Sequence, residues 1–185
     1  LDRKFAEKYI DQYTASKASN GHEPSAPPEL SPERAIVYMR LATDLLENDP
    51  VLALSVAERS LRIAVPPETL VFLATLRKKD VAQASTMFGV ALNNIKLRRG
   101  LDINELLLLY SYVFSPMRVP VFSSQGLAVF NIPTYRTITM NYSVDAGLAK
   151  QYLTTAMGIL LDEQRYYPGN IQRLTNGLEG DFCLI

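Results

Sequence analysis

The stretch DPVLALSVAERSL, residues 49–61, decides the fold because its pattern recurs 31 residues later as DVAQASTMFGVAL, residues 80–92. Each copy begins with an aspartate, which is a preferred residue for capping a helix N-terminus. The preceding stretches match at the same shift. Residues 35–62 and 66–93 are therefore predicted to be two copies of one helix-turn-helix unit. The matching apolar residues of the preceding stretches are Met39, Leu41, Ala42 and Leu45, which fall on Leu70, Phe72, Leu73 and Leu76.

A third copy of the pattern lies downstream of these two. Its partner helix is predicted at residues 103–114, so an insertion at about 115–142 splits the third unit. Small residues let paired helices approach closely, and large apolar residues fill the space between pairs. A single pair cannot bury both faces, so the units must stack. The third copy consists of Asp145, Ala149, Leu153, Ala156 and Met157, spaced like Asp49, Ala53, Ala57, Ser60 and Leu61.

Local signals give the bounds of the helices. Caps and first-turn prolines predict starts at Ser31-Pro32, Asp49-Pro50, Pro66-Pro67, Asp80 and Asp102. The expected ends lie near residues 48, 64, 79, 99 and 114, and a sixth helix is expected at about 144–165. Gln83 and Glu105 are placed to complete capping boxes with Asp80 and Asp102. Arg77-Lys78-Lys79 is predicted to offset a helix dipole rather than to form a binding patch.

These elements predict an all-α fold of stacked antiparallel helix pairs. About six to seven helices are expected, with a partly β-like insertion between the fifth and sixth helices counted from Ser31. Residues 1–30 are predicted to hold an N-terminal helix and a polar linker, residues 31–165 the helical-repeat domain, and residues 166–185 a C-terminal tail. Phe5, Tyr9 and Tyr13 form an aromatic stripe on the first helix, which either packs on the domain or pairs with a partner.

Paired helices, alanines such as Ala53 and Ala84 at close-packing positions, and a period in the low thirties resemble the tetratricopeptide-repeat class. The resemblance covers about half of the chain. The tryptophan, the glycine-tyrosine pair and the closing proline of that family's consensus are absent, and its usual period is longer. The resemblance therefore implies the architecture and a binding scaffold, and it assigns no ligand residue.

Composition excludes several classes of function. The 185 residues carry nineteen cationic and nineteen acidic side chains, so no large basic field points to a nucleic-acid partner. No apolar run reaches the ~20 residues of a membrane span. A single cysteine, Cys183, and a single histidine, His22, offer no metal site, and no catalytic or cofactor motif is present. The start at Leu1 suggests an exported bacterial protein, while the oligomeric state is left open.

The insertion differs in character from the rest of the chain. Residues 116–142 contain three prolines and many apolar residues. Val119–Phe122 and Leu127–Asn131 are predicted to pair as a hairpin around the turn SSQG, residues 123–126. A long apolar insertion of this kind is often functional. Two interpretations follow, namely a lid or wall of a ligand groove, and a cap over an open end of the helix stack.

The main hypothesis is a scaffold without enzymatic activity that binds a peptide or protein partner through the insertion and a concave face. Aromatic anchors tend to dominate such interfaces. The alternative is a small-molecule binding or catalytic domain with an enclosed cavity between the helices and the insertion. A shallow groove would favour the first. The candidate anchors are Tyr110, Tyr112, Phe122, Phe130 and Tyr135, and the candidate polar groups of a pocket are Asn94, Tyr112, Arg118 and Arg136.

Overall fold

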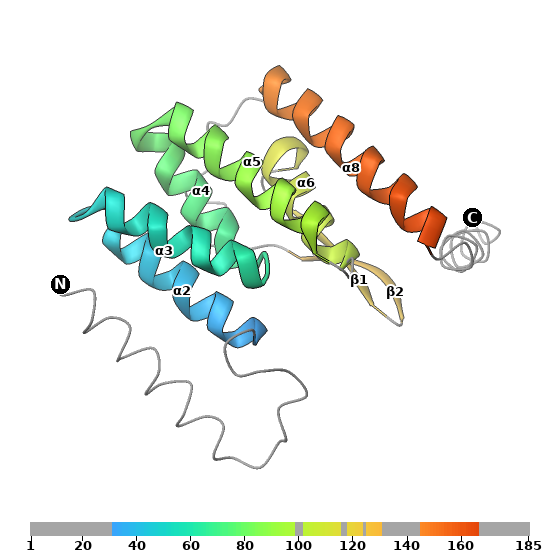
Figure 1. The fold of residues 1–185 in the computed structure, drawn as a ribbon, viewed down its shortest axis with the longest axis horizontal. Helices are drawn as coiled ribbons and strands as arrows, with labels where there is room; N and C mark the ends of the chain where they lie inside the picture. Colours follow the sequence, from blue (N-terminus) through green and yellow to red (C-terminus); the bar gives the residue numbers. More distant parts are fainter. Residues whose placement is uncertain (1–30, 99–101, 116–117, 124, 131–144, 167–185) are drawn as a thin grey trace, which may run out of the picture. The chain divides into compact units, whose positions relative to one another are not determined.

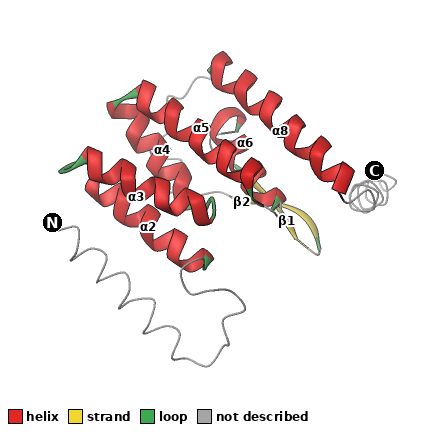
Figure 2. Ribbon diagram, viewed as in Figure 1, coloured by secondary structure: helices red, strands yellow, loops and turns green. Residues whose placement is uncertain are grey.

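The fold of the chain was analysed in a computed structural model. It describes residues 31–98, 102–115, 118–123, 125–130 and 145–166, with the side chains of 163–166 left aside. Within these ranges the chain forms six α-helices and one two-stranded antiparallel sheet (Figure 2). The prediction of an all-α fold with a β-like insertion is thus confirmed. The predicted helix at residues 2–15 lies outside the described residues.

The helices begin and end close to their predicted positions. The strands likewise occupy the two halves of the predicted hairpin, and Gly126 adopts a positive φ of 107° at the turn, where a glycine is favoured. The helices are α2 (Pro32–Leu45), α3 (Pro50–Ile63), α4 (Glu68–Lys79), α5 (Val81–Leu97), α6 (Ile103–Phe114) and α8 (Ala146–Tyr166), and the strands are β1 (Val119–Ser123) and β2 (Gly126–Phe130) (Figure 1).

The contacts within the chain divide it into two compact units, Leu1–Ala91 and Leu92–Ile185. The first unit contains α2, α3, α4 and most of α5. The second contains the end of α5, then α6, the hairpin and α8. The hairpin and the residues predicted for binding therefore belong to the second unit.

Aspartate caps define three of the helix starts. The Asp49 side chain accepts a hydrogen bond from the main-chain N–H of Leu52 at 3.0 Å, and the Asp80 side chain accepts one from Gln83 at 2.9 Å. The Asp145 side chain accepts hydrogen bonds from the main-chain N–H groups of Gly147 and Leu148, at 2.8 and 3.1 Å. Each carboxylate satisfies an N–H that has no partner inside its helix and faces the positive end of the helix dipole. The aspartates of all three copies thus act as predicted.

In the first unit, α2 and α3 form an antiparallel pair (Figure 1). The Ser60 hydroxyl, near the end of α3, donates to the carbonyl of Ala35, near the start of α2, at 2.7 Å. Ala53 and Ala57 are fully buried in α3, as are Met39 and Ala42 in α2. Small residues on one side therefore permit the close approach that the repeat predicted.

Helices α2 and α4 run in the same direction, as the first helices of successive repeats should. Arg40 donates through Nε and Nη2 to Glu68 Oε1, at 3.0 and 2.6 Å. Further along both helices, Lys79 Nζ donates to the carbonyl of Leu46 at 3.1 Å and pairs with Glu47 at 2.8 Å. Because Lys79 reaches the carbonyl end of α2, its charge offsets the dipole of that helix.

The two copies of the repeat bury the same positions. Val56 and Met87 are buried, and so are Leu61 and Leu92. The shared hydrophobic face of these helices therefore follows from the sequence pattern.

The third copy follows the predicted pattern only in part: Ala156 is buried, as is Ser60 at the matching position, whereas two apolar positions are exposed. Leu153 is 50% exposed and Met157 61% exposed, although they correspond to Ala57 and Leu61. The partner of α8 is α6, as predicted. The helix is turned so that Tyr152 rather than Leu153 faces α6, and Tyr152 donates its hydroxyl to the carbonyl of Leu106 at 2.9 Å. The buried face of α8 consists of Leu148, Tyr152, Ala156 and Ile159.

Candidate functional site

The site lies in the second unit, where an ion pair fixes the start of α6. Arg98 donates from Nη1 and Nη2 to the two carboxylate oxygens of Glu105, at 2.6 and 2.5 Å. Glu105 is buried, and the two-pronged geometry offsets the cost of removing its charge from water. The Glu105 carboxylate, which was expected to complete a capping box with Asp102, binds Arg98 in this way. Asp102 still caps α6 by accepting from the N–H of Asn104 at 2.9 Å.

Asn104, in the first turn of α6, anchors the hairpin. Its side-chain oxygen accepts the main-chain N–H of Phe122 at 2.6 Å, and its amide nitrogen donates to the carbonyl of Phe122 at 3.0 Å. The carboxamide thus binds β1 as a neighbouring strand would. This contact occupies the outer edge of β1 at Phe122, near the end of the strand.

The pairing of β1 with β2 determines where the groups of β2 point. Phe122 lies opposite Leu127, and Pro120 opposite Val129. In an antiparallel ladder, residue pairs alternate between those bonded to each other and those whose N–H and C=O point outward. Phe122 uses its main-chain groups on Asn104, so the main-chain groups of Leu127 and Val129 must point away from β1. Neither has a further main-chain partner in the part of the chain that the structure describes.

Three aromatic rings join α6 to α8. The ring of Tyr110 lies 5.0 Å from that of Phe114 and 6.2 Å from that of Tyr152, and Phe114 lies 5.8 Å from Tyr152. Burial, and to a lesser extent the neighbouring Tyr110, raises the pKa of Tyr152 from 10.0 to about 12. Tyr152 is therefore neutral at ordinary pH and acts as a hydrogen-bond donor.

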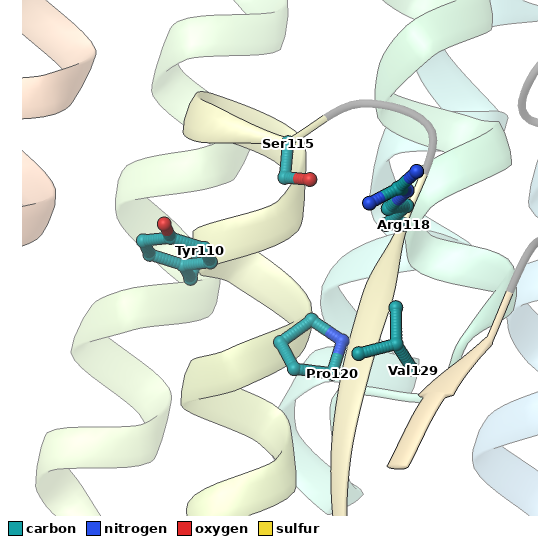
Figure 3. Close-up of a pocket in the computed structure, with 5 residues that line it drawn as sticks. All are labelled: Tyr110, Ser115, Arg118, Pro120 and Val129. Carbon is teal, nitrogen blue, oxygen red and sulfur yellow. The ribbon is translucent and has the colours of Figure 1, made fainter. Parts of the chain in front are cut away.

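A pocket of about 440 Å³ lies between the end of α6 and the hairpin (Figure 3). Tyr110 and Ser115 come from α6 and the residue that follows it, Arg118 precedes β1, and Pro120 and Val129 face each other across the two strands. Tyr110 and Arg118 are exposed, and Val129 is 57% exposed. The pocket is therefore an open groove of mixed character, in which the apolar side chains of Pro120 and Val129 lie near the phenol of Tyr110, the hydroxyl of Ser115 and the guanidinium of Arg118.

Arg118 differs from Arg40 and Arg98, each of which forms an ion pair. Arg40 binds Glu68 and Arg98 binds Glu105, whereas no described carboxylate pairs with the guanidinium of Arg118. Its main-chain N–H donates to the carbonyl of Ser115 at 3.0 Å, which fixes the turn that carries it. Within the described residues, the groove thus presents a positive charge without an acidic partner close to the apolar side chains of Pro120 and Val129.

The residues predicted for binding are distributed unevenly. Tyr110 and Arg118 line the groove, whereas Tyr112 is fully buried and belongs to the core of the unit. Phe122 is half-buried, and Phe130 is exposed but points to the face of the sheet opposite Val129. Asn94 is half-buried and its carbonyl accepts from Arg98. Tyr135 and Arg136 lie outside the described residues.

The sequence-based prediction missed three residues that line the groove, Ser115, Pro120 and Val129. The hairpin pattern held the signal for two of them. Residues of opposing strands that face each other lie on one face of a sheet, so the predicted register would have placed Pro120 beside Val129. Whether Ser115 lines the groove depends on where its side chain lies at the end of α6. Pro116 predicts that the helix ends near Ser115, but it does not predict the position of that side chain.

Comparisons with known proteins assign no family. The chain matches no protein-family model, and no curated protein and no solved structure is significantly similar to it. Among the described residues, no group of three or more histidine, cysteine, aspartate or glutamate side chains is arranged to hold a metal ion. None of the described helices combines the length and the apolar character needed to cross a membrane.

Proposed function

We propose that this chain is a non-enzymatic helical-repeat scaffold whose second unit binds a peptide or protein partner in the groove between α6 and the hairpin. The observation that carries the proposal is the exposed apolar wall of that groove, formed by Pro120 and Val129, next to Arg118. An exposed cation beside an apolar surface fits a partner that offers both an apolar side chain and a carboxylate.

The antiparallel pair α2–α3 and the parallel course of α2 and α4 support the scaffold part of the proposal. Both features are expected of helical repeats that resemble the tetratricopeptide class, in which stacked hairpins present binding surfaces. The resemblance suggests the general role of a scaffold. The groove suggests where the partner binds and which side chains it offers.

A small-molecule site is the second candidate, because about 440 Å³ falls within the range of ligand pockets. Ligand pockets enclose most of the surface of their ligand, whereas Val129, Tyr110 and Arg118 all face solvent. The open groove therefore favours a larger partner that covers these residues from outside.

The proposal is tested by selecting peptides from a display library of random sequences on the full chain. We expect enriched peptides whose binding weakens about tenfold in Val129→Ser, because an apolar contact at the centre of the site is lost. The matched control is Leu97→Ser, at the end of α5, where the leucine is 71% exposed. The control should bind as the unaltered chain does, and circular dichroism should show equal helicity in all three proteins. Enrichment of no peptide would contradict the proposal.

A further inference from the structure

We infer that the outer edge of β2 is a docking site for an extended peptide, which adds a third strand to the hairpin and brings a carboxylate to Arg118. The inference rests on the proposed function and specifies how the partner binds. Strand addition is a common way of recognising peptides, in which main-chain hydrogen bonds supply affinity and side-chain pockets supply specificity.

The main-chain groups of β2 are available for such a strand. The N–H and C=O groups of Leu127 and Val129 point away from β1 and have no partner among the described residues. The opposite edge of the hairpin is closed at Phe122 by Asn104. Among the described residues, Asn104 therefore occupies the outer edge of β1 at Phe122, whereas the outer edge of β2 offers the unbonded main-chain groups of Leu127 and Val129.

The composition of β2 lacks the devices that usually protect an edge. Native proteins guard exposed edges with charged side chains, prolines or bulges. The sequence of β2, GLAVF at residues 126–130, has no charge and no proline, and its pairing with β1 is regular. Leu127 is 56% exposed and Val129 57% exposed. An unprotected apolar edge of this kind favours pairing with another strand.

The face of the hairpin directs the added strand toward the groove. Leu127 and Val129 share one face of the sheet with Pro120, and that face borders the pocket with Tyr110. Side chains alternate along a strand, so every second residue of an added strand would lie on this face. One of these residues would lie beside Val129 and enter the groove.

The charge at the groove selects the chemistry of the occupant. No carboxylate in the described part of the chain pairs with Arg118, whereas Arg40 and Arg98 each form an ion pair. A peptide whose carboxylate lies on the same face of the added strand as its apolar residue could complete a two-pronged pair with the guanidinium. This carboxylate is either an acidic side chain or the C-terminus of the peptide, because both offer the same two oxygens.

The inference is tested with the enriched peptides of the display experiment, synthesised with a free C-terminus, with a C-terminal amide, and with N-methyl groups on alternate residues. We expect N-methylation in one of the two alternating phases to weaken binding at least tenfold, because it removes the donors that face β2. The other phase should have little effect. Loss of affinity on amidation would show that the C-terminal carboxylate binds Arg118. Unchanged affinity would show that an acidic side chain of the peptide does so.

Arg118→Gln should abolish the preference for the carboxylate and weaken binding about tenfold. Arg62→Gln, at an exposed arginine of α3, serves as the matched control and should leave binding unchanged. Leu127→Lys places a charge on the edge strand and should weaken binding while helicity is retained.

The outcomes separate the two proposals. Peptides that bind and lose affinity in Val129→Ser, but tolerate N-methylation in both phases, would overturn strand addition and leave the proposed function intact. Helical peptides whose binding is lost in Met157→Asp on α8, and not in Val129→Ser, would overturn strand addition and also the placement of the partner in the groove. A dimer detected by light scattering and abolished by Leu127→Lys would identify a second copy of the chain as the occupant of the β2 edge. This result would overturn the peptide assignment. Enrichment of no peptide would overturn both proposals.

Discussion

Helices α3 and α8 carry the same spacing of an aspartate and four small or apolar residues, yet two positions that are buried in α3 are exposed in α8. In α3 the fourth, eighth, eleventh and twelfth residues after Asp49 are buried. In α8 the eighth and twelfth residues after Asp145, Leu153 and Met157, are exposed. The aspartate determines where a helix begins, whereas the neighbouring element determines which side of the helix faces inward.

The neighbours of the two helices explain the difference. In the first unit, α3 packs on α2 through alanines and the buried bond from Ser60 to Ala35. In the second unit, α8 packs on α6 through the large ring of Tyr152, which lies among other aromatic rings. The face of α8 that contains Tyr152 therefore packs against α6.

The largest difference between the two helices is expected on truncation at the twelfth position. Leu61→Ala in α3 should lower the free energy of unfolding by about 2–5 kcal/mol, because it leaves a cavity in a closed core. Met157→Ala in α8 should change it by less than about 0.5 kcal/mol, because the side chain is largely solvated. Urea unfolding monitored by circular dichroism gives both values. Equal losses would show that α8 buries the same face as α3.

In the second unit, the side chain of Asn104 holds the hairpin against α6. Asn104→Ala should lower the free energy of unfolding by about 2 kcal/mol, because both main-chain groups of Phe122 lose their partner. The measurement is urea unfolding, with amide exchange of the hairpin as a local probe. Asn93→Ala, at an exposed asparagine of α5, is the matched control and should have a small effect. Retention of hairpin protection in Asn104→Ala would contradict the anchoring role.

Tyr152 predicts a dependence of stability on alkaline pH. Its pKa is raised from 10.0 to about 12 in the folded chain, so the folded state holds this proton more tightly than the unfolded state. The stabilisation is present below pH 10 and is lost as the pH rises toward and through 12. The loss should be on the order of 1–2 kcal/mol relative to Tyr152→Phe, which has no proton to release. A constant difference between the two proteins from pH 9 to pH 12 would contradict the assignment.

Ser60→Ala should destabilise the chain less than Leu61→Ala or Asn104→Ala. It removes the hydrogen bond to Ala35 and makes α3 identical to the second copy of the repeat at this position, where Ala91 stands. We expect a loss of about 1 kcal/mol, because one buried hydrogen bond is removed and the carbonyl of Ala35 can still accept within its own helix. Thermal unfolding measures this change. A loss above about 3 kcal/mol would show that the serine does more than join the two helices.

The starts of the helices could be predicted because they depend on local chemistry. Asp49, Asp80 and Asp145 each bind N–H groups within their own first turn, which needs no knowledge of the rest of the chain. The hairpin was predictable for the same reason, since the turn residues and the apolar strands lie close together in sequence. These signals account for the agreement in element order.

The packing of α8 and the bonding of Glu105 could not be predicted in this way. Leu153 and Met157 fit the repeat pattern, and only the position of α6 shows that Tyr152 fills the inner face instead. Glu105 is correctly spaced for a capping box, but Arg98 offers it two charged donors. Both outcomes depend on contacts between elements. The groove follows the same rule, because Tyr110, Arg118 and Val129 meet only when the hairpin is seated on α6.

The most direct test of the account is amide hydrogen exchange of β2, measured by NMR on the free chain. The account predicts that the amides of Leu127 and Val129 exchange rapidly, whereas those of Ala128 and Phe130 are protected by their bonds to β1. Bound peptide should then protect Leu127 and Val129. Equal protection of all four amides in the free chain would show that the edge is already paired, and would contradict the claim that it is open to a partner.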